Sequence, residues 1–371
     1  MKNFPMMDEP NQLLILDQKN NNFKKRKKAS VKIAILFLIF VFGGFAFYYN
    51  NVFSEKNENE NENEIKEIPA VKGEMDIKTS PDGASLLSQY SFPIPVYTPV
   101  KKEGISELRV PNAHASIIID VDSGTILHYN QGEEERQIAS LTKIMTAILV
   151  VENIEDLKNE KVIIDEEAVY AEGTRIGCPR SGYCINTRLN VGEIISAEEL
   201  LKAMIMNSAN DSAIALAKHI GGSQKEFSKM MNERARKMGL KNSNFCTSSG
   251  LEIEGKENEC YSSAYDIARI TAYSMKYSEI WEIFQIPSAT IYSFDGKISH
   301  EIMNTNALLE EMPECLGAKT GFTPLAGRSL MLAATDKQKK HKIVVILLDD
   351  PYRWGDAKDM VYWAFNSYEW K

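Results

Sequence analysis

The sequence predicts an α+β domain, in which one antiparallel sheet is flanked by helices and a mainly helical subdomain is inserted. Runs rich in β-branched residues occur at 114–120 and 342–348, and the stretch between them has mostly helical periodicity. We expect these N- and C-terminal strands to be neighbours in the sheet. About 265 residues follow a polar stretch that ends near residue 105, which is enough for one large core.

A basic and then apolar segment stands near the start of the chain. Residues 24–28 are all Lys or Arg, and an uncharged run follows over 33–49. These 17 residues would reach about 25 Å as a helix, near the lower limit for crossing a bilayer. We expect 1–32 to be a cytoplasmic tail and 33–49 a transmembrane signal anchor, with the rest extracytoplasmic. The alternatives are a cleavable signal peptide and a buried core helix.

Residues 50–104 lack the apolar content of a folded domain. Glu and Asn alternate over 58–64, and five prolines follow between residues 69 and 99. Such a composition cannot bury enough apolar surface to offset the entropy of ordering the chain. We therefore expect a disordered extracytoplasmic linker over 50–104 and a folded domain over 105–371.

The folded domain is expected to open with a hairpin. His114–Asp120 and Thr125–Tyr129 are runs typical of strands, and Asp122-Ser123-Gly124 between them has turn chemistry. The apolar residues of Ala139–Val151 lie on every side, which predicts a largely buried helix. The other expected elements are helices over 196–206, 211–220, 224–238, 263–275 and 356–365 and strands over 330–334 and 342–348.

Composition excludes several classes of function. The 43 Lys and Arg residues are outnumbered by 51 Asp and Glu, and the net charge of -8 gives no basic footprint for nucleic acid. The five histidines show no metal-ligand spacing such as His-Glu-x-x-His, which disfavours a zinc peptidase. We therefore expect no metal, no other cofactor and no nucleic-acid partner.

Three short patterns carry the chemistry of this domain. Ser140-Leu141-Thr142-Lys143 places a hydroxyl and an amine three residues apart on one helix face. A neutral amine in that position can remove the proton of the serine and activate it as a nucleophile. Ser208-Ala209-Asn210 stands between two helices, and Lys319-Thr320-Gly321 precedes the strand at 330–334. Taken singly, each pattern also fits an ordinary cap, connection or turn.

Taken together, the order S-x-x-K, S-x-N, K-T-G is the signature of penicillin-binding proteins and serine β-lactamases. The flanking sequence resembles more narrowly the low-molecular-mass D-alanyl-D-alanine carboxypeptidases, for example over 124–147, 188–222 and 317–334. The resemblance extends over about residues 107–370. It implies a DD-peptidase/β-lactamase-like fold and a serine hydrolase.

The resemblance also assigns catalytic roles. Ser140 would be the acylated nucleophile and Lys143 its general base, with a pKa lowered by burial and by the nearby Lys319. Ser208 would pass a proton to the departing amine. Asn210 would hold the amide of the substrate.

Four further positions would bind the substrate, namely Thr320, Gly321, Phe322 and Arg353, and Gly321 would let the backbone of the substrate come close. The backbone N–H groups of Ser140 and Phe322, the latter just after Gly321, would form an oxyanion hole, each donor worth about 3 kcal/mol. Thr320 and Arg353 would bind the terminal carboxylate of the peptide. The Arg353 assignment depends on a basic residue that precedes an aromatic residue in the family, here Arg353-Trp354.

The implied reaction is the removal of the terminal D-alanine from peptidoglycan stem pentapeptides that end in D-Ala-D-Ala, with β-lactam antibiotics as covalent inhibitors. One alternative is a DD-endopeptidase that acts on peptidoglycan cross-links. A β-lactamase and a non-catalytic penicillin-binding sensor are further alternatives. No Glu-x-x-Leu-Asn segment follows Asn210, which disfavours a class A β-lactamase.

Five cysteines in an exported domain suggest disulfides and leave at least one thiol. We expect Cys178 to pair with Cys184, which closes a short loop, and Cys246 to pair with Cys260, with Cys315 free. The alternative is that all five stay reduced. The segment that contains Cys178 and Cys184 departs from the Gly-Ser-rich sequence usual in the family, which leaves substrate preference open.

Overall fold

The computed structural model describes residues 97–178 and 184–371. The expected cytoplasmic tail (1–32), the expected anchor (33–49) and most of the expected linker lie outside the described residues. Within the described ranges, no helix combines the length and the apolar composition that crossing a membrane requires.

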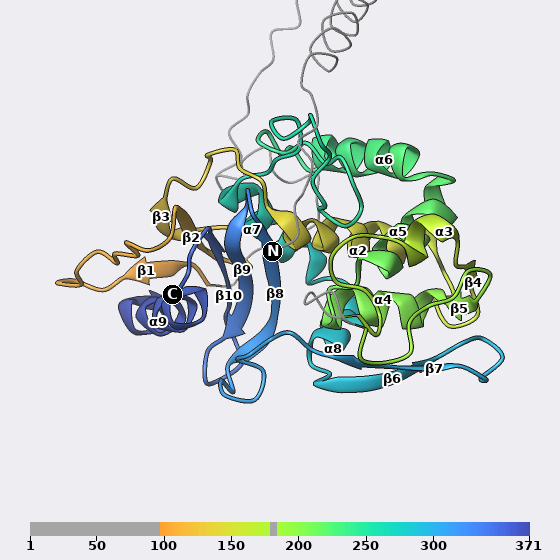
Figure 1. Cartoon of the computed structure of the whole chain (residues 1–371). Coiled ribbons are helices and arrows are strands. Elements are labelled where there is room, and N and C mark those ends of the chain that lie inside the picture. Colours follow the sequence, from red (N-terminus) through yellow and green to blue (C-terminus); the bar gives the residue numbers. More distant parts are fainter. Residues whose placement is uncertain (1–96, 179–183) are drawn as a thin grey trace, which may run out of the picture. The chain divides into compact units, whose positions relative to one another are not determined.

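Antiparallel pairing builds a five-stranded sheet in the order β3-β2-β10-β9-β8 (Figure 1). Its strands are β2 (Ala115–Asp120), β3 (Ile126–Asn130), β8 (Cys315–Thr323), β9 (Gly327–Thr335) and β10 (Lys342–Leu348). Ile117 of β2 lies opposite Ile346 of β10, so the prediction that the N- and C-terminal strands are neighbours is confirmed.

The β8 strand lies at one edge of this sheet and carries Lys319-Thr320-Gly321. Taken singly, this tripeptide also fitted a turn, but it lies within a strand. Two glycines and few β-branched residues give the segment CLGAKTGFT a weak strand propensity. Pairing with β9 along nearly its whole length overrides that propensity.

Both faces of the sheet are buried, which explains why its inner strands are continuous apolar runs. Ile117 and Ile119 belong to a core shared with the helical part of the domain. Ile118 and Val345 belong to a second core, closed by α9 (Arg353–Ser367). Figure 1 shows α9 on one side of the sheet and most of the other helices on the opposite side.

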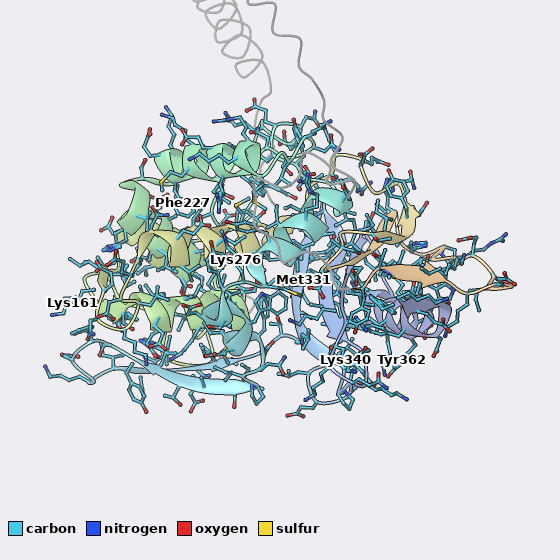
Figure 2. All side chains as sticks on the ribbon, turned by 180° about the vertical axis from the view of Figure 1, so that it is seen from behind. Lys161, Phe227, Lys276, Met331, Lys340 and Tyr362 are labelled. Atoms are coloured by element: carbon cyan, nitrogen blue, oxygen red, sulfur yellow. A yellow bond between two sulfur atoms is a disulfide. The ribbon has the colours of Figure 1, made fainter. Side chains whose placement is uncertain are left out.

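The helical part confirms most of the expected helices. It contains η1 (Ala139–Thr142), α2 (Lys143–Asn153), α4 (Ala197–Met206), α5 (Asn210–Gly221), α6 (Gln224–Lys237), α7 (Ala264–Ser274) and α8 (Ser278–Phe284). Residues 143–150 of α2 are all buried, as predicted for the helix that follows Ser140. Figure 2 shows, from behind, Phe227 on α6 and Met331 on β9, two fully buried members of this core.

The helix α8 was not expected, nor were several short elements that complete the domain. They are β1 (Pro99–Lys101), β4 (Lys161–Ile163), α3 (Glu166–Val169), β5 (Ile194–Ser196), β6 (Ser288–Tyr292), β7 (Ser299–Met303) and β11 (Tyr368–Trp370). β1 falls within the residues expected to form the linker, yet it pairs with β11. Regular structure therefore begins before residue 105, and Pro99 is tolerated because β1 is a short strand of a two-stranded ladder.

Two disulfides join Cys178 to Cys184 and Cys246 to Cys260, and Cys315 is a buried free thiol. All three expectations for the cysteines are confirmed. The first bridge closes a loop between α3 and β5, and the second closes a loop between α6 and α7.

Candidate active site

Ser140 lies in η1, the 3-10 turn that leads into α2. The helix expected over 139–151 thus begins with a tighter turn, and Ala139 before the serine adopts a φ of 47°. Positive φ is uncommon outside glycine and concentrates at functional sites. Lys143 begins α2, and its Nζ donates a hydrogen bond to Ser140 Oγ over 2.9 Å. The expected contact between hydroxyl and amine is confirmed.

The Lys143 amine is buried, with 1% of the residue exposed. Besides Ser140, its Nζ donates to Asn210 Oδ1 and to the backbone oxygen of Ser249, each over 2.7 Å. Both of these oxygens can accept a hydrogen bond but cannot donate one. When Lys143 loses a proton, its two remaining N–H groups stay with them, so the lone pair faces Ser140 Oγ. The three contacts therefore aim the neutral amine at the serine hydroxyl.

Burial is the largest cause that lowers the pKa of Lys143 well below its ordinary value. The Lys319 ammonium lowers it further, whereas the carboxylate of Asp211 raises it. Burial, followed by the charge of Arg353, lowers the pKa of Lys319 to about 7. Desolvation destabilises the charged form of each amine, so each gives up its proton more readily than an exposed lysine does.

Ser208 lies in the connection between α4 and α5, with a φ of 58° and 8% of the residue exposed. Its Oγ accepts a hydrogen bond from Lys319 Nζ over 2.7 Å. The same Nζ donates to the backbone oxygen of Thr320 over 3.2 Å. Since the Ser208 oxygen serves as an acceptor toward Lys319, its own proton is left to donate elsewhere.

Asn210 is the first residue of α5, and its side chain links Lys143 to a neighbouring loop. While Oδ1 accepts from Lys143, Nδ2 donates to the backbone oxygen of Glu172 over 2.7 Å. The backbone N–H of Asn210 donates to Thr174 O over 2.8 Å. Both the oxygen and the nitrogen of the Asn210 side-chain amide are therefore hydrogen-bonded. The expected role of Asn210 in holding an amide of the substrate stays a prediction.

Two contributors to the site were missed by sequence reasoning, Ser249 and Glu172. Both act through backbone oxygens. Every residue type has such an oxygen, so the sequence does not reveal this role. The one available signal was Gly250, where an added Cβ would lie 1.9 Å from the backbone oxygen of Ala139. Its φ of 77° and this close approach require glycine, and they press the loop that carries Ser249 against η1.

The β8 edge supplies the substrate-binding residues expected from the sequence. Thr320 and Phe322 are partly exposed, and Thr320 Oγ1 lies 3.4 Å from Thr305 Oγ1. Gly321, between them, has a structural reason to be glycine in addition to the expected approach of the substrate, which stays a prediction. A Cβ at Gly321 would lie 2.7 Å from the backbone oxygen of Ile138, so glycine allows β8 to pack on η1.

Arg353 begins α9, and its Nη1 donates to the backbone oxygens of Gly321 and Ser329 over 2.9 and 3.0 Å. These bonds join the guanidinium to β8 next to Thr320. Its role in binding a carboxylate stays a prediction, as does the oxyanion hole at the backbone of Ser140 and Phe322.

The described residues thus bring the five expected catalytic side chains into one cluster: hydrogen bonds join Ser140, Lys143 and Asn210 in one group and Ser208 and Lys319 in another, and the charge of Lys319 acts on Lys143. Within residues 97–178 and 184–371, no group of three or more His, Cys, Asp or Glu side chains is arranged to hold a metal ion. A serine whose proton is taken by a neutral lysine can attack a carbonyl carbon. A second serine beside a cation can protonate the leaving group.

An active-site serine with a buried lysine base, set between a helical region and an edge strand, defines a class of serine acyl-transfer enzymes. Residues 103–350 match the D-alanyl-D-alanine carboxypeptidase family, and the chain belongs to that family.

Relatives and a solved structure agree with this family. The chain is 32% identical over 261 residues to the D-alanyl-D-alanine carboxypeptidase DacF of Bacillus subtilis, which covers 69% of this chain and 63% of that protein. It is 30% identical over 239 residues to a D-alanyl-D-alanine endopeptidase of Haemophilus influenzae, covering 64% of this chain and 76% of the relative. The crystal structure of a Mycobacterium tuberculosis D-alanyl-D-alanine carboxypeptidase superposes with a TM-score of 0.63 at 26% identity, over 72% of this chain and 96% of that one.

The match covers only part of the length of the curated carboxypeptidases. The chain spans somewhat less than two thirds of the length of the Bacillus subtilis relative, 63%.

Proposed function

We propose that the protein is a membrane-anchored serine hydrolase that removes the terminal D-alanine from peptidoglycan stem pentapeptides. The reaction proceeds through an acyl-Ser140 intermediate and is sensitive to penicillin. Family membership and the named relatives support the activity. The anchor is the uncharged run at 33–49, with the catalytic domain outside the cell membrane.

One observation carries the proposal: Lys143 Nζ contacts Ser140 Oγ while its other two hydrogen bonds go to oxygens that only accept. A capping serine beside a surface lysine would show neither the burial nor the three fixed partners. This arrangement prepares a lone pair for the serine proton before any substrate arrives.

Acylation begins when neutral Lys143 takes the proton of Ser140. The Oγ then attacks the carbonyl carbon of the penultimate D-alanine and forms a C–O bond. The backbone N–H groups of Ser140 and Phe322 stabilise the resulting oxyanion. When the tetrahedral intermediate collapses, the C–N bond breaks and the terminal D-alanine leaves as an amine.

The departing amine needs a proton, and Ser208 supplies it. Lys319 already donates to Ser208 Oγ, so it replaces that proton and becomes neutral. Its pKa of about 7 suits this exchange. Water then attacks the acyl-enzyme and its proton returns through Ser208 to Lys319, while Lys143 gives its proton back to Ser140. Both lysines end in their starting states.

The peptide binds along β8, because an edge strand presents unpaired backbone groups to an extended chain. Thr320 and Arg353 hold the terminal carboxylate, and Asn210 holds the amide of the preceding residue. The partners are therefore stem peptides ending in D-Ala-D-Ala, with β-lactams as covalent inhibitors.

The test uses the full chain in detergent, with Ser140→Ala as its matched control. Intact mass after benzylpenicillin should show one adduct per chain that the variant lacks. D-Alanine should be released from a Lys-D-Ala-D-Ala peptide by the wild type alone. Folded wild-type protein that forms no adduct would contradict the active-site assignment.

A second candidate function is DD-endopeptidase activity on cross-links, because one relative bears that name. Linear and cross-linked muropeptides offered to the same preparation separate the two. Cleavage of the cross-linked substrate without D-alanine release from the linear one would favour the endopeptidase.

A further inference from the structure

Asp211 is a buried carboxylate next to the catalytic cluster that the proposed reaction does not use. It follows Asn210 in the first turn of α5, and 1% of the residue is exposed. Its Oδ2 accepts from the backbone N–H of Ile176 over 2.9 Å, and Oδ1 accepts from the N–H of Ser212 over 2.8 Å.

The first of these bonds holds a segment that also touches Asn210. Residues 172–176 give Asn210 two acceptors, the backbone oxygens of Glu172 and Thr174. Asp211 binds the same segment two residues farther on, at Ile176. Asn210 and Asp211 together therefore fix this segment, and through Asn210 they fix the position of Lys143 Nζ.

The second contribution of Asp211, to the charge around Lys143, is electrostatic. Lys143 and Lys319 are both 1% exposed, and their hydrogen bonds go to hydroxyl, amide and backbone oxygens. Among the described residues, no carboxylate forms an ion pair with either amine within 4.0 Å. The charges that act on Lys143 are the Lys319 ammonium from β8 and the Asp211 carboxylate from α5. Burial raises the pKa of Asp211 to about 6, against its hydrogen bonds from Ile176 and Ser212 and the charges of Arg175 in the loop and His300 in β7, so the carboxylate is charged at neutral pH.

We infer that Asp211 is a positioning residue of the acyl-transfer reaction, which holds segment 172–176 against Asn210 and provides the counter-charge to the buried Lys143 ammonium. This inference rests on the proposed function. A carboxylate close to a base that must become neutral sets the pH at which acylation begins, since charges interact strongly where water is excluded.

The matched substitution is Asp211→Asn, which keeps the shape of the side chain and one acceptor oxygen for Ile176 but removes the charge. Without the carboxylate, protonated Lys143 is less stable, so more of it is neutral at a given pH. The acidic limb of the pH profile for acylation by a fluorescent penicillin should therefore move down by about one unit. Asp266→Asn is the control, because Asp266 is equally buried and also accepts a hydrogen bond from a backbone N–H, that of Asn242. The acidic limb of the pH profile of this variant should not move.

A purely structural Asp211 would give a slower variant whose acidic limb stays at the wild-type pH, and that result overturns the inference. If the wild type itself is not acylated, the proposed function fails instead, so the two failures are distinguishable. If Asp211→Asn does not fold, NMR titration of the wild type takes its place. The Lys143 Cε and Asp211 Cγ resonances should then share a titration step, and independent steps overturn the inference.

Discussion

Lys319 Nζ lies 2.7 Å from Ser208 Oγ, which joins the edge strand β8 to the connection between α4 and α5. Ser208 and Lys319 are 111 residues apart in the sequence, so the contact forms only when the helical part and the sheet pack together. The bond gives the cluster two serine-lysine pairs, Ser140 with Lys143 and Ser208 with Lys319. Each pair is expected to respond differently to substitution.

Lys143→Met should slow acylation by a fluorescent penicillin by roughly 10²- to 10⁴-fold, the usual contribution of a general base. Methionine preserves most of the buried volume of the side chain but offers no lone pair to Ser140. Stopped-flow acylation kinetics would measure the loss. Lys202→Met on α4, which removes a partly exposed lysine paired with Glu199, is the control and should acylate at the wild-type rate. A Lys143→Met variant as fast as this control would contradict the base assignment.

Lys319→Met should raise Tm, and more so below pH 7 than at pH 9. In the unfolded chain Lys319 has its ordinary pKa of 10.5, whereas burial lowers it to about 7 in the folded protein. Between these values the unfolded state binds a proton that the folded state does not, so the free energy of unfolding of the wild type rises with pH. Below pH 7 both states are protonated, and the penalty for burying the ammonium is complete. Differential scanning calorimetry of both proteins tests this, and a difference in Tm that does not change with pH would refute it.

Gly321→Ala should weaken both folding and acylation. The added Cβ would meet the backbone oxygen of Ile138 at 2.7 Å, so β8 must move away from η1. We expect a loss of about 1–3 kcal/mol in the free energy of unfolding together with slower acylation. Gly355→Ala in α9 is the control, since nothing lies within 4 Å of its added Cβ; it should stabilise by about 0.5–1 kcal/mol. Urea unfolding and acylation kinetics measure both effects, and equal behaviour of the two variants would count against the packing argument.

The two disulfides should differ in what their removal affects. Loss of Cys178–Cys184 frees one end of the segment whose Glu172 and Thr174 oxygens hold Asn210, so acylation should slow. Loss of Cys246–Cys260 opens the longer loop, 14 against 6 residues of separation, and should lower Tm more. Double serine variants of each pair allow the comparison by calorimetry and acylation kinetics. A larger Tm loss for the Cys178–Cys184 variant would reverse the expected order.

Sequence reasoning predicted which side chains would meet at the candidate site, because their identity and order carry the chemistry. The S-x-x-K spacing alone predicts the contact between Ser140 and Lys143, since residues three apart share a helix face. The pairing of Cys178 with Cys184 followed from the short loop between them. The apolar runs at 114–120 and 342–348 predicted neighbouring strands because their residues are buried on both faces of the sheet.

What the sequence did not reveal depends on tertiary contacts. The β8 strand has weak strand propensity and forms through pairing with β9 and packing on η1. Ser249 and Glu172 take part through backbone oxygens, whose position no residue type encodes. β1 was hidden in a proline-rich stretch because its stability comes from β11, more than 260 residues later.

The pairing of β1 with β11 has a mechanical consequence. Tension carried by the residues before Tyr97 enters the domain at Thr98, which exchanges two backbone hydrogen bonds with Lys371. Because this end of the ladder is loaded first, its bonds break one after another rather than together. β1 would then extend by about 3.3 Å per residue. The load would pass next to the segment before β2, where Val110 and Ala113 pack in the second core and the N–H of His114 donates to the backbone oxygen of Leu348 in β10. The ladder of β1 with β11 is therefore expected to yield to such a pull before the strands of the central sheet do.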